Sequence, residues 1–209
     1  MFLSQDGPQA LLALYAGERL FRSRPGRFLQ ERAARSRSTE PATPPVHLFP
    51  MNRITQIVGL VLLLGLCFAA AAAGGAATYP QLQGWYAGLA RPPWTPPGWL
   101  FGPVWAALYT AMAVAAWLVW RQAGLAAARW PLGLFAVQLG LNVAWSWLFF
   151  GLRSPGLGLI EILLLWIAIA ATLASFWRRT TAAGLLLAPY LAWVTFAAVL
   201  NAAIWRLNA

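Results

Sequence analysis

Residues 131–150 read PLGLFAVQLGLNVAWSWLFF, an uncharged stretch dominated by apolar and aromatic side chains. Its length matches the ~20 residues that an α-helix needs to cross the hydrocarbon core of a bilayer. A membrane β-barrel would instead show segments of about ten residues with alternating polarity. The stretch therefore predicts a transmembrane helix.

Four further apolar stretches of comparable length accompany it, at residues 54–78, 98–120, 156–177 and 182–205. Their borders are marked by arginines, namely Arg53, Arg121, Arg129, Arg153, Arg178, Arg179 and Arg206. All connections except residues 79–97 are short, which favours antiparallel neighbours. With 60% hydrophobic residues and a mean hydropathy of +0.62, the sequence predicts an all-α membrane protein, a bundle of five transmembrane helices.

Residues 1–50 differ from this pattern, because they contain no tryptophan while all 13 tryptophans follow Met51. The segment is rich in arginine and ends in several prolines, which do not continue a helix. Three interpretations stay open: sequence translated upstream of a natural start at Met51, a disordered cytosolic tail, or an organellar transit peptide, against which its four acids argue. We place the boundary of the membrane domain, residues 51–209, at Met51.

The arginines also predict the orientation in the membrane. Counted on alternate sides of the five spans, five of them share the side of the N terminus (Arg53, Arg121, Arg129, Arg178 and Arg179), and three lie opposite (Arg91, Arg153 and Arg206). Positive charge is retained on the cytoplasmic side. We therefore expect a multi-pass protein of a bacterial cell membrane with a cytoplasmic N terminus.

Several classes of function are disfavoured by composition. The net charge is +10, but the chain has no lysine and its arginines are scattered, so a nucleic-acid partner is not expected. Cys67 stands alone, and His47 lies in the extension, which leaves no ligand set for a metal in the membrane domain. Its single acid, Glu161, forms no carboxylate pair or proton relay. As an intramembrane carboxyl, Glu161 is either functional or structural, and we expect a structural role with an interfacial partner such as Arg153.

The segment 85–109, WYAGLARPPWTPPGWLFGPVWAALY, concentrates aromatic residues and prolines. Four prolines, at positions 92, 93, 96 and 97, fix φ and remove amide donors, so this connection is stiff and cannot form an ordinary helix. Two interpretations are open. The segment is a stiff aromatic lid, or its tryptophans and tyrosines form the aromatic belt found at membrane interfaces.

Residues 131–150 present two opposed faces when placed on a helix. One face carries Gln138, Asn142 and Trp145, and the other, about 200° away, carries Ala136, Gly140 and Ala144. Amide side chains are costly in lipid and turn inward, either toward a ligand or as bonds between helices. Small residues let a second helix approach closely, so this face predicts a homodimer interface.

The last span also has a patterned face. Trp193, Ala197 and Leu200 alternate bulky and small side chains at helical spacing. This face makes room for a flat ligand, although plain helix packing explains the same pattern.

Four co-linear motifs carry a resemblance to a known family. They are WYAGLARPPWTPP (85–97), GPVWAALY (102–109), PLGLFAVQLGLNVAWSWLFFG (131–151) and PYLAWVTFAAVLN (189–201). On these motifs, residues 51–208 resemble the translocator protein family, also called tryptophan-rich sensory proteins or peripheral-type benzodiazepine receptors. The resemblance implies a five-helix bundle, often dimeric, that binds protoporphyrin and other tetrapyrroles, sterols and isoquinoline-type compounds beneath the first loop.

Carried over position by position, the resemblance implies a pocket formed by Tyr86, Pro96, Trp105, Gln138, Asn142, Trp145, Trp193, Ala197 and Leu200. We expect Arg91 to meet a propionate at the mouth of this pocket. Porphyrin or haem would be a ligand, not a prosthetic group, so no cofactor is expected.

One departure bears on sterols. Eukaryotic members carry an aromatic residue between an aliphatic and a basic one at the end of the fifth helix, but here Leu200 and Arg206 enclose Ala202 and Ala203. A loose match to that pattern falls instead in the first loop, at Leu82, Tyr86 and Arg91. Tight sterol binding at the fifth helix is therefore not expected.

The expected function is that of a membrane receptor or carrier for tetrapyrroles with a regulatory or stress-related role. Two alternatives stay open. One is light-dependent breakdown of the bound porphyrin, with Trp105 and Trp193 as the oxidisable residues. The other is porphyrin transport across the membrane.

Overall fold

The computed structural model describes residues 52–209, and the predicted extension 1–50 with its boundary at Met51 lies outside them. Every regular element within residues 52–209 is helical. The helices are α3 (Arg53–Leu82), α4 (Gly98–Ser146), α5 (Pro155–Trp177) and α6 (Thr181–Asn208), with a short 3-10 turn η1 (Tyr86–Gly88) and a π-helical segment η2 (Trp147–Gly151). Four helical stretches of this region are long and apolar enough to cross a membrane.

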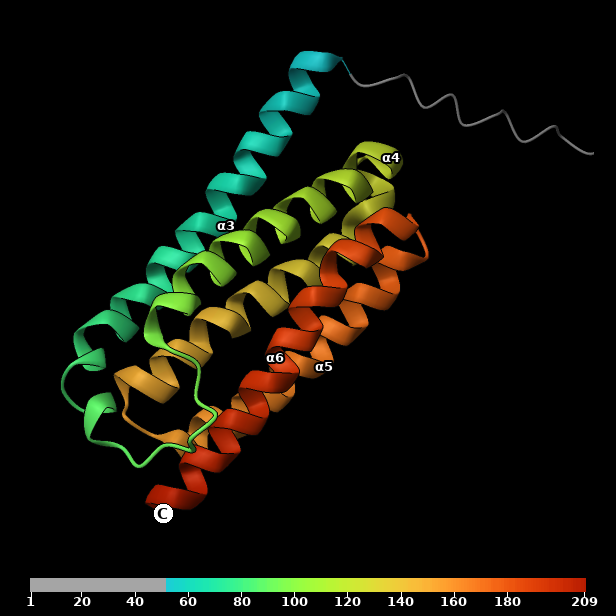
Figure 1. The fold of residues 1–209 in the computed structure, drawn as a ribbon. Coiled ribbons are helices and arrows are strands. Elements are labelled where there is room, and N and C mark those ends of the chain that lie inside the picture. Colours follow the sequence, from blue (N-terminus) through green and yellow to red (C-terminus); the bar gives the residue numbers. More distant parts are fainter. Residues whose placement is uncertain (1–51) are drawn as a thin grey trace, which may run out of the picture. The chain divides into compact units, whose positions relative to one another are not determined.

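Helix α4 folds back on itself at Gly124. The backbone there has φ 70° and ψ 168°, and the residues on both sides, 98–123 and 125–146, form two arms that run side by side (Figure 1). Only glycine adopts such angles without strain. The arms are joined by a hydrogen bond from the hydroxyl of Tyr109 to the carboxamide oxygen of Asn142.

The expected spans differ from the observed helices mainly at this turn. Separate spans are expected at 98–120 and 131–150 with a short connection between them, and the structure continues the helical backbone through residues 121–130 except at Gly124. The alanines of this connection favour helix, so a single glycine suffices for the reversal. The other helices are each slightly longer than expected.

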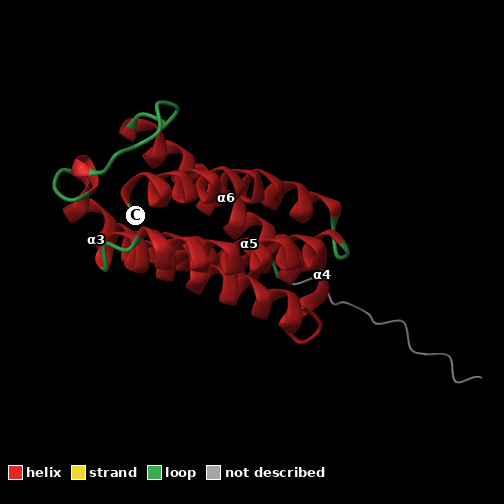
Figure 2. Ribbon diagram, turned by 90° about the horizontal axis from the view of Figure 1, so that it is seen from below, coloured by secondary structure: helices red, strands yellow, loops and turns green. Residues whose placement is uncertain are grey.

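The ends of the helices follow local rules. Asn52 accepts a hydrogen bond from the amide of Ile54 at the start of α3, and Ser154 accepts one from the amide of Leu157 at the start of α5. Pro155 occupies the first turn of α5, where its missing N–H costs nothing. The loop at residues 83–97 lies at the end of the bundle where α6 ends (Figures 1 and 2).

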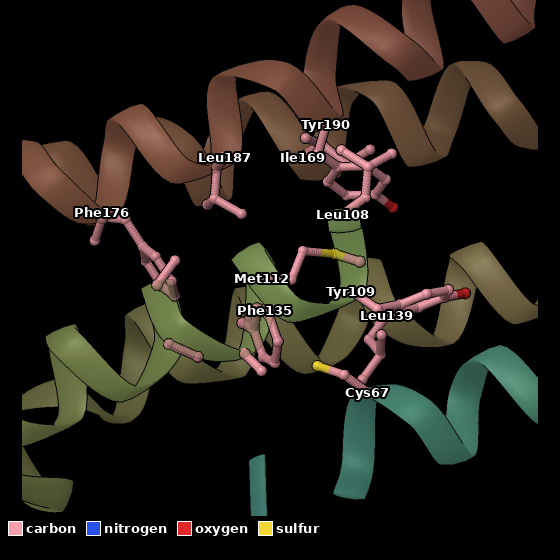
Figure 3. Packing of buried hydrophobic residues seen from close by; sticks show 14 of the residues in the cluster. Cys67, Leu108, Tyr109, Met112, Phe135, Leu139, Ile169, Phe176, Leu187 and Tyr190 are labelled. Carbon is pink, nitrogen blue, oxygen red and sulfur yellow. The ribbon is translucent and has the colours of Figure 1, made fainter. Parts of the chain in front are cut away.

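The core is shared by all four helices. Met112 of the first arm is fully buried, and Figure 3 shows Leu187 of α6, Phe135 of the second arm and Cys67 of α3 gathered around it. Cys67 thus packs as a small apolar side chain. These contacts fix the spacing of the helices on which the cavity described below depends.

The turn at Gly124 generates the first prediction. Gly124→Ala should lower the free energy of unfolding by about 1–3 kcal/mol, because alanine at φ 70° and ψ 168° is strained. The measurement is thermal unfolding in detergent. Gly133→Ala is the matched control, since Gly133 lies in the same helix with open space at its Cβ position and should be neutral or slightly stabilised. Equal free energies of unfolding for Gly124→Ala and Gly133→Ala would contradict the positive φ at Gly124.

Candidate functional site

A cavity of about 540 Å³ lies among the helices of the bundle, of the size typical for small-molecule sites. Its walls come from α3, both arms of α4, η2, α5 and α6, and loop residues form its mouth. Nine of the ten predicted ligand residues line it, namely Tyr86, Arg91, Pro96, Trp105, Asn142, Trp145, Trp193, Ala197 and Leu200. Residues from all four motifs are therefore brought together.

Gln138 is the predicted residue that does not line the cavity. It is 1% exposed and lies between the arms of α4, where its amide nitrogen is 3.8 Å from the sulfur of Met112. Its side-chain oxygen has no hydrogen-bond partner among residues 52–209. Gln138 and Asn142 share a helix face and are one turn apart. Gln138 nevertheless lies in the core, whereas Asn142 lines the cavity.

Asn142 is both a wall residue and a bond between helices. Its carboxamide oxygen accepts from the hydroxyl of Tyr109, and its amide nitrogen donates to the hydroxyl of Tyr190 over 3.0 Å. We call this set of bonds the Asn142 brace. Each partner is buried in an apolar core, where an unpaired hydroxyl or amide is costly. The brace therefore ties both arms of α4 to α6 beside the cavity.

Trp145 is held in a similar way. Its indole N–H donates to the side-chain oxygen of Asn201 over 3.1 Å, and the amide of Asn201 donates to the carbonyl of Pro155 over 2.7 Å. The Trp145 ring also stacks on Phe149, with centroids 5.2 Å apart. The nitrogen of Trp145 is thus committed to the fold, while the indole ring contributes to the cavity wall.

Trp105 and Trp193 form another part of the wall. The Trp105 ring lies 5.5 Å from that of Tyr109, and the Trp193 ring lies 5.8 Å from that of Phe101. Neither indole N–H has a hydrogen-bond partner within residues 52–209, in contrast to that of Trp145. Both groups are therefore available as donors to a bound molecule.

The mouth of the cavity combines a tyrosine with an arginine. The guanidinium carbon of Arg91 lies 5.2 Å from the centre of the Tyr86 ring, a cation–π distance. Burial raises the pKa of Tyr86, and the nearby Arg91 charge lowers it in part. Arg91 is the one charged residue of the cavity lining within the described chain, so the mouth favours an anionic group.

The expected pair of Glu161 and Arg153 is wrong. Glu161 is 5% exposed, and neither of its carboxyl oxygens has a hydrogen-bond partner among residues 52–209. The guanidinium of Arg153 instead donates to the side-chain oxygen of Gln81 over 3.1 Å. This contact draws the arginine toward the end of α3.

The small face of the second arm of α4 lies on the outside of the bundle. Ala136 and Gly140 are exposed, Ala144 is half-buried, and a Cβ added at Gly140 would meet no atom within 4 Å. The geometry leaves this face free for lipid or for a second helix.

Part of the wall was missed by the sequence reasoning. Helix α3 lines the cavity with small side chains, among them Ala71, Gly74 and Thr78. Their spacing of three and four residues is typical of one helix face. The apolar stretch 54–78 was interpreted only as a span, and small side chains without polar or aromatic chemistry gave no sign of a ligand.

Long apolar helices around an internal cavity with aromatic walls define a multi-pass membrane protein whose bundle encloses a cavity of small-molecule size. The comparison with known proteins names the family. Residues 63–206 match the TspO/MBR family, and the chain belongs to it.

Individual relatives agree with this assignment. The tryptophan-rich protein TspO of Chlorobaculum tepidum is 44% identical over 162 residues, covering 76% of this chain and 99% of the relative. The human translocator protein is 47% identical over 126 residues, 59% of this chain and 75% of the relative. Protein CrtK of Rhodobacter capsulatus is 37% identical over 155 residues, 72% of this chain and 95% of the relative.

The Asn142 brace generates a second prediction. Asn142→Leu should lower the free energy of unfolding by about 1–3 kcal/mol, because the Tyr109 and Tyr190 hydroxyls lose a buried partner. Gln138→Leu is the matched control on the same helix face, and it should be neutral or stabilising because the Gln138 oxygen is unpaired within the described residues. Thermal unfolding of both variants measures the difference. Loss of stability in Gln138→Leu alone would refute the brace.

Proposed function

We propose that the cavity binds a flat, largely apolar molecule with acidic groups at its edge, and that this molecule is a tetrapyrrole such as protoporphyrin IX or haem. The observation that carries the proposal is the combination of tryptophan rings along the walls with a single cation, Arg91, at the mouth. The protein acts on this account as a membrane receptor or carrier with a regulatory or stress-related role.

The proposed mode of binding is stacking combined with shape. Trp105, Trp145 and Trp193 offer ring faces and apolar contact to the macrocycle. The free indole N–H groups of Trp105 and Trp193 offer hydrogen bonds, and Arg91 pairs with a propionate. Binding of this kind needs no metal ligand, so the tetrapyrrole is a ligand and not a cofactor.

The names of relatives support a role in sensing or translocation. Relatives include a translocator protein of Homo sapiens and a tryptophan-rich sensory protein of Cereibacter sphaeroides. We propose sterol-like ligands only second to tetrapyrroles. The sterol pattern of eukaryotic members needs an aromatic residue at the end of the fifth helix, and this chain has Ala202 and Ala203 there.

We further propose that the chain crosses a bacterial cell membrane five times, with each arm of α4 spanning it and the N terminus in the cytoplasm. Each arm exceeds the ~20 residues that a crossing needs. Arg179 donates to the carbonyl of Ala127 over 3.1 Å, so the Gly124 turn and the start of α6 lie at one end of the bundle. The arginines of that end, Arg121, Arg129, Arg178 and Arg179, then face the cytoplasm.

Light-dependent porphyrin breakdown is the alternative that a specific observation favours. Trp105 and Trp193 line the cavity with unpaired indole groups and would lie beside a bound photosensitiser. Illumination separates the two functions. An unchanged porphyrin spectrum supports a receptor or carrier, whereas bleaching that requires Trp105 or Trp193 supports an enzyme. Flux of intact porphyrin across vesicles would identify a transporter.

A homodimer through Ala136, Gly140 and Ala144 completes the proposal. This small-residue face lies opposite Asn142 on the same helix, so one surface serves the partner and the other serves the cavity.

The stacking mode predicts the effect of removing the rings. Trp145→Ala and Trp193→Ala should each weaken protoporphyrin binding by about 1–3 kcal/mol, the range for a buried aromatic contact. Iron-free and iron-loaded porphyrin should bind comparably. Quenching of intrinsic fluorescence measures both affinities. Trp130→Ala is the control, since Trp130 is 74% exposed and outside the cavity. A preference for haem above about a hundredfold would defeat the stacking mode, because ring contacts do not distinguish iron-loaded from iron-free porphyrin.

The two faces of the second arm predict opposite phenotypes. Gly140→Leu should split the dimer by blocking close approach of the helices, yet leave porphyrin affinity within a few-fold. Asn142→Leu should weaken binding and preserve the dimer. Gly65→Leu adds the same bulk to exposed α3, where a Cβ meets no atom within 4 Å, and serves as the control. Mass analysis in detergent reports the oligomer, and a surviving dimer with lost binding in Gly140→Leu would show that the faces are reversed.

A further inference from the structure

The last turn of α6 is bonded to the loop between α3 and α4. The side-chain oxygen of Asn208 accepts a hydrogen bond from the amide of Ala90 over 3.0 Å. The amide nitrogen of Asn208 donates to the carbonyl of the same Ala90 over 2.9 Å. One side chain thus satisfies both backbone groups of a residue 118 positions earlier in the chain.

A third hydrogen bond fixes the orientation of this side chain. The Asn208 amide also donates to the carbonyl of Ile204 over 2.7 Å, one turn back in α6. The carboxamide is therefore held in place by its own helix while it pairs with the loop. A carboxamide is required for this pairing because it presents an acceptor and two donors together.

The position of Ala90 connects this pairing to the cavity. Ala90 directly precedes Arg91, which lines the cavity and lies over the ring of Tyr86. Beyond Arg91 the prolines make the chain stiff, so a fixed point at Ala90 restrains the segment that forms the mouth. A second contact to α6, between the rings of Trp94 and Phe196 at 5.9 Å, lies further along the loop.

We propose that Asn208 is a positioning residue that latches the loop 83–97 over the cavity and thereby sets how long a ligand stays bound. The inference rests on the proposed function for its ligand, and on the three hydrogen bonds of Asn208 for its geometry. Asn208 itself does not line the cavity. It acts through Ala90 on Arg91 and Tyr86.

The latch predicts a kinetic effect. A ligand beneath the loop leaves when the loop opens, so a weaker latch raises the open population and the dissociation rate. Each lost hydrogen bond is worth about 0.5–1.5 kcal/mol, and loss of the pair at Ala90 converts to roughly a 5- to 150-fold faster opening. The association rate should rise or stay constant, because opening also admits the ligand.

The experiment compares the full chain with Asn208→Ala, Asn208→Asp and Leu207→Ala. Asn208→Asp should also open the loop, because its carboxylate has no N–H to donate and faces the carbonyl oxygens of Ala90 and Ile204. Leu207 is exposed at the neighbouring position and serves as the control. Hydrogen exchange of ligand-free protein in detergent reports the loop, and stopped-flow release of protoporphyrin reports ligand residence. Faster exchange should be confined to peptides of the loop 83–97, whereas a merely structural role would speed exchange in the helices as well.

The outcomes separate the latch from the proposed ligand. Faster exchange of loop peptides and faster release in both Asn208 variants, with Leu207→Ala like the parent, support the proposal. Unchanged loop exchange in Asn208→Ala overturns the latch. Faster exchange with unchanged release overturns its role in residence time. Absence of porphyrin binding to the parent chain would defeat the proposed function, while the exchange experiment still decides the latch.

Discussion

The carboxamide of Asn142 is the interaction on which the site depends. Helices in a bilayer gain little from hydrophobic association, so packing and hydrogen bonds between them determine how they are arranged. By bonding Tyr109 and Tyr190, Asn142 joins both arms of α4 to α6 beside the cavity. The indole of Trp145 continues this attachment one turn further through Asn201. Hydrogen bonds inside the bundle thus fix the relative positions of helices whose aromatic side chains line the cavity.

The cavity wall combines groups of different chemistry. Trp145 has its polar group bonded within the fold, whereas the indole N–H groups of Trp105 and Trp193 remain unpaired in the described residues. At the mouth, Arg91 adds a positive charge, and Asn208 fixes the adjacent Ala90. The planar ligand with an acidic edge that we propose is complementary to this combination of groups. On the same proposal the loop takes part in binding through Arg91, next to the fixed Ala90.

The sequence predicted the helical membrane class and the aromatic part of the cavity wall, because apolar length and aromatic motifs are strong local signals. The prediction failed where contacts between distant residues determine the path of the chain or the partner of a side chain. Gly124 reverses a helix that its neighbours would continue, and no pattern distinguishes it from other glycines. Arg153 bonds Gln81 and not Glu161, since both partners of a long-range contact must be known. Gln138 and Asn142 share a helix face, yet only the neighbours of each side chain place Asn142 at the cavity.

The most direct test is titration of the purified protein with protoporphyrin in the dark, compared with Ala197→Trp, which fills a half-buried position of the cavity wall. Tryptophan fluorescence of the parent chain should be quenched to saturation at one porphyrin per chain. The variant should keep its helical content and lose the saturable quenching. Equal saturable quenching in both proteins would place the ligand outside the cavity and contradict the account.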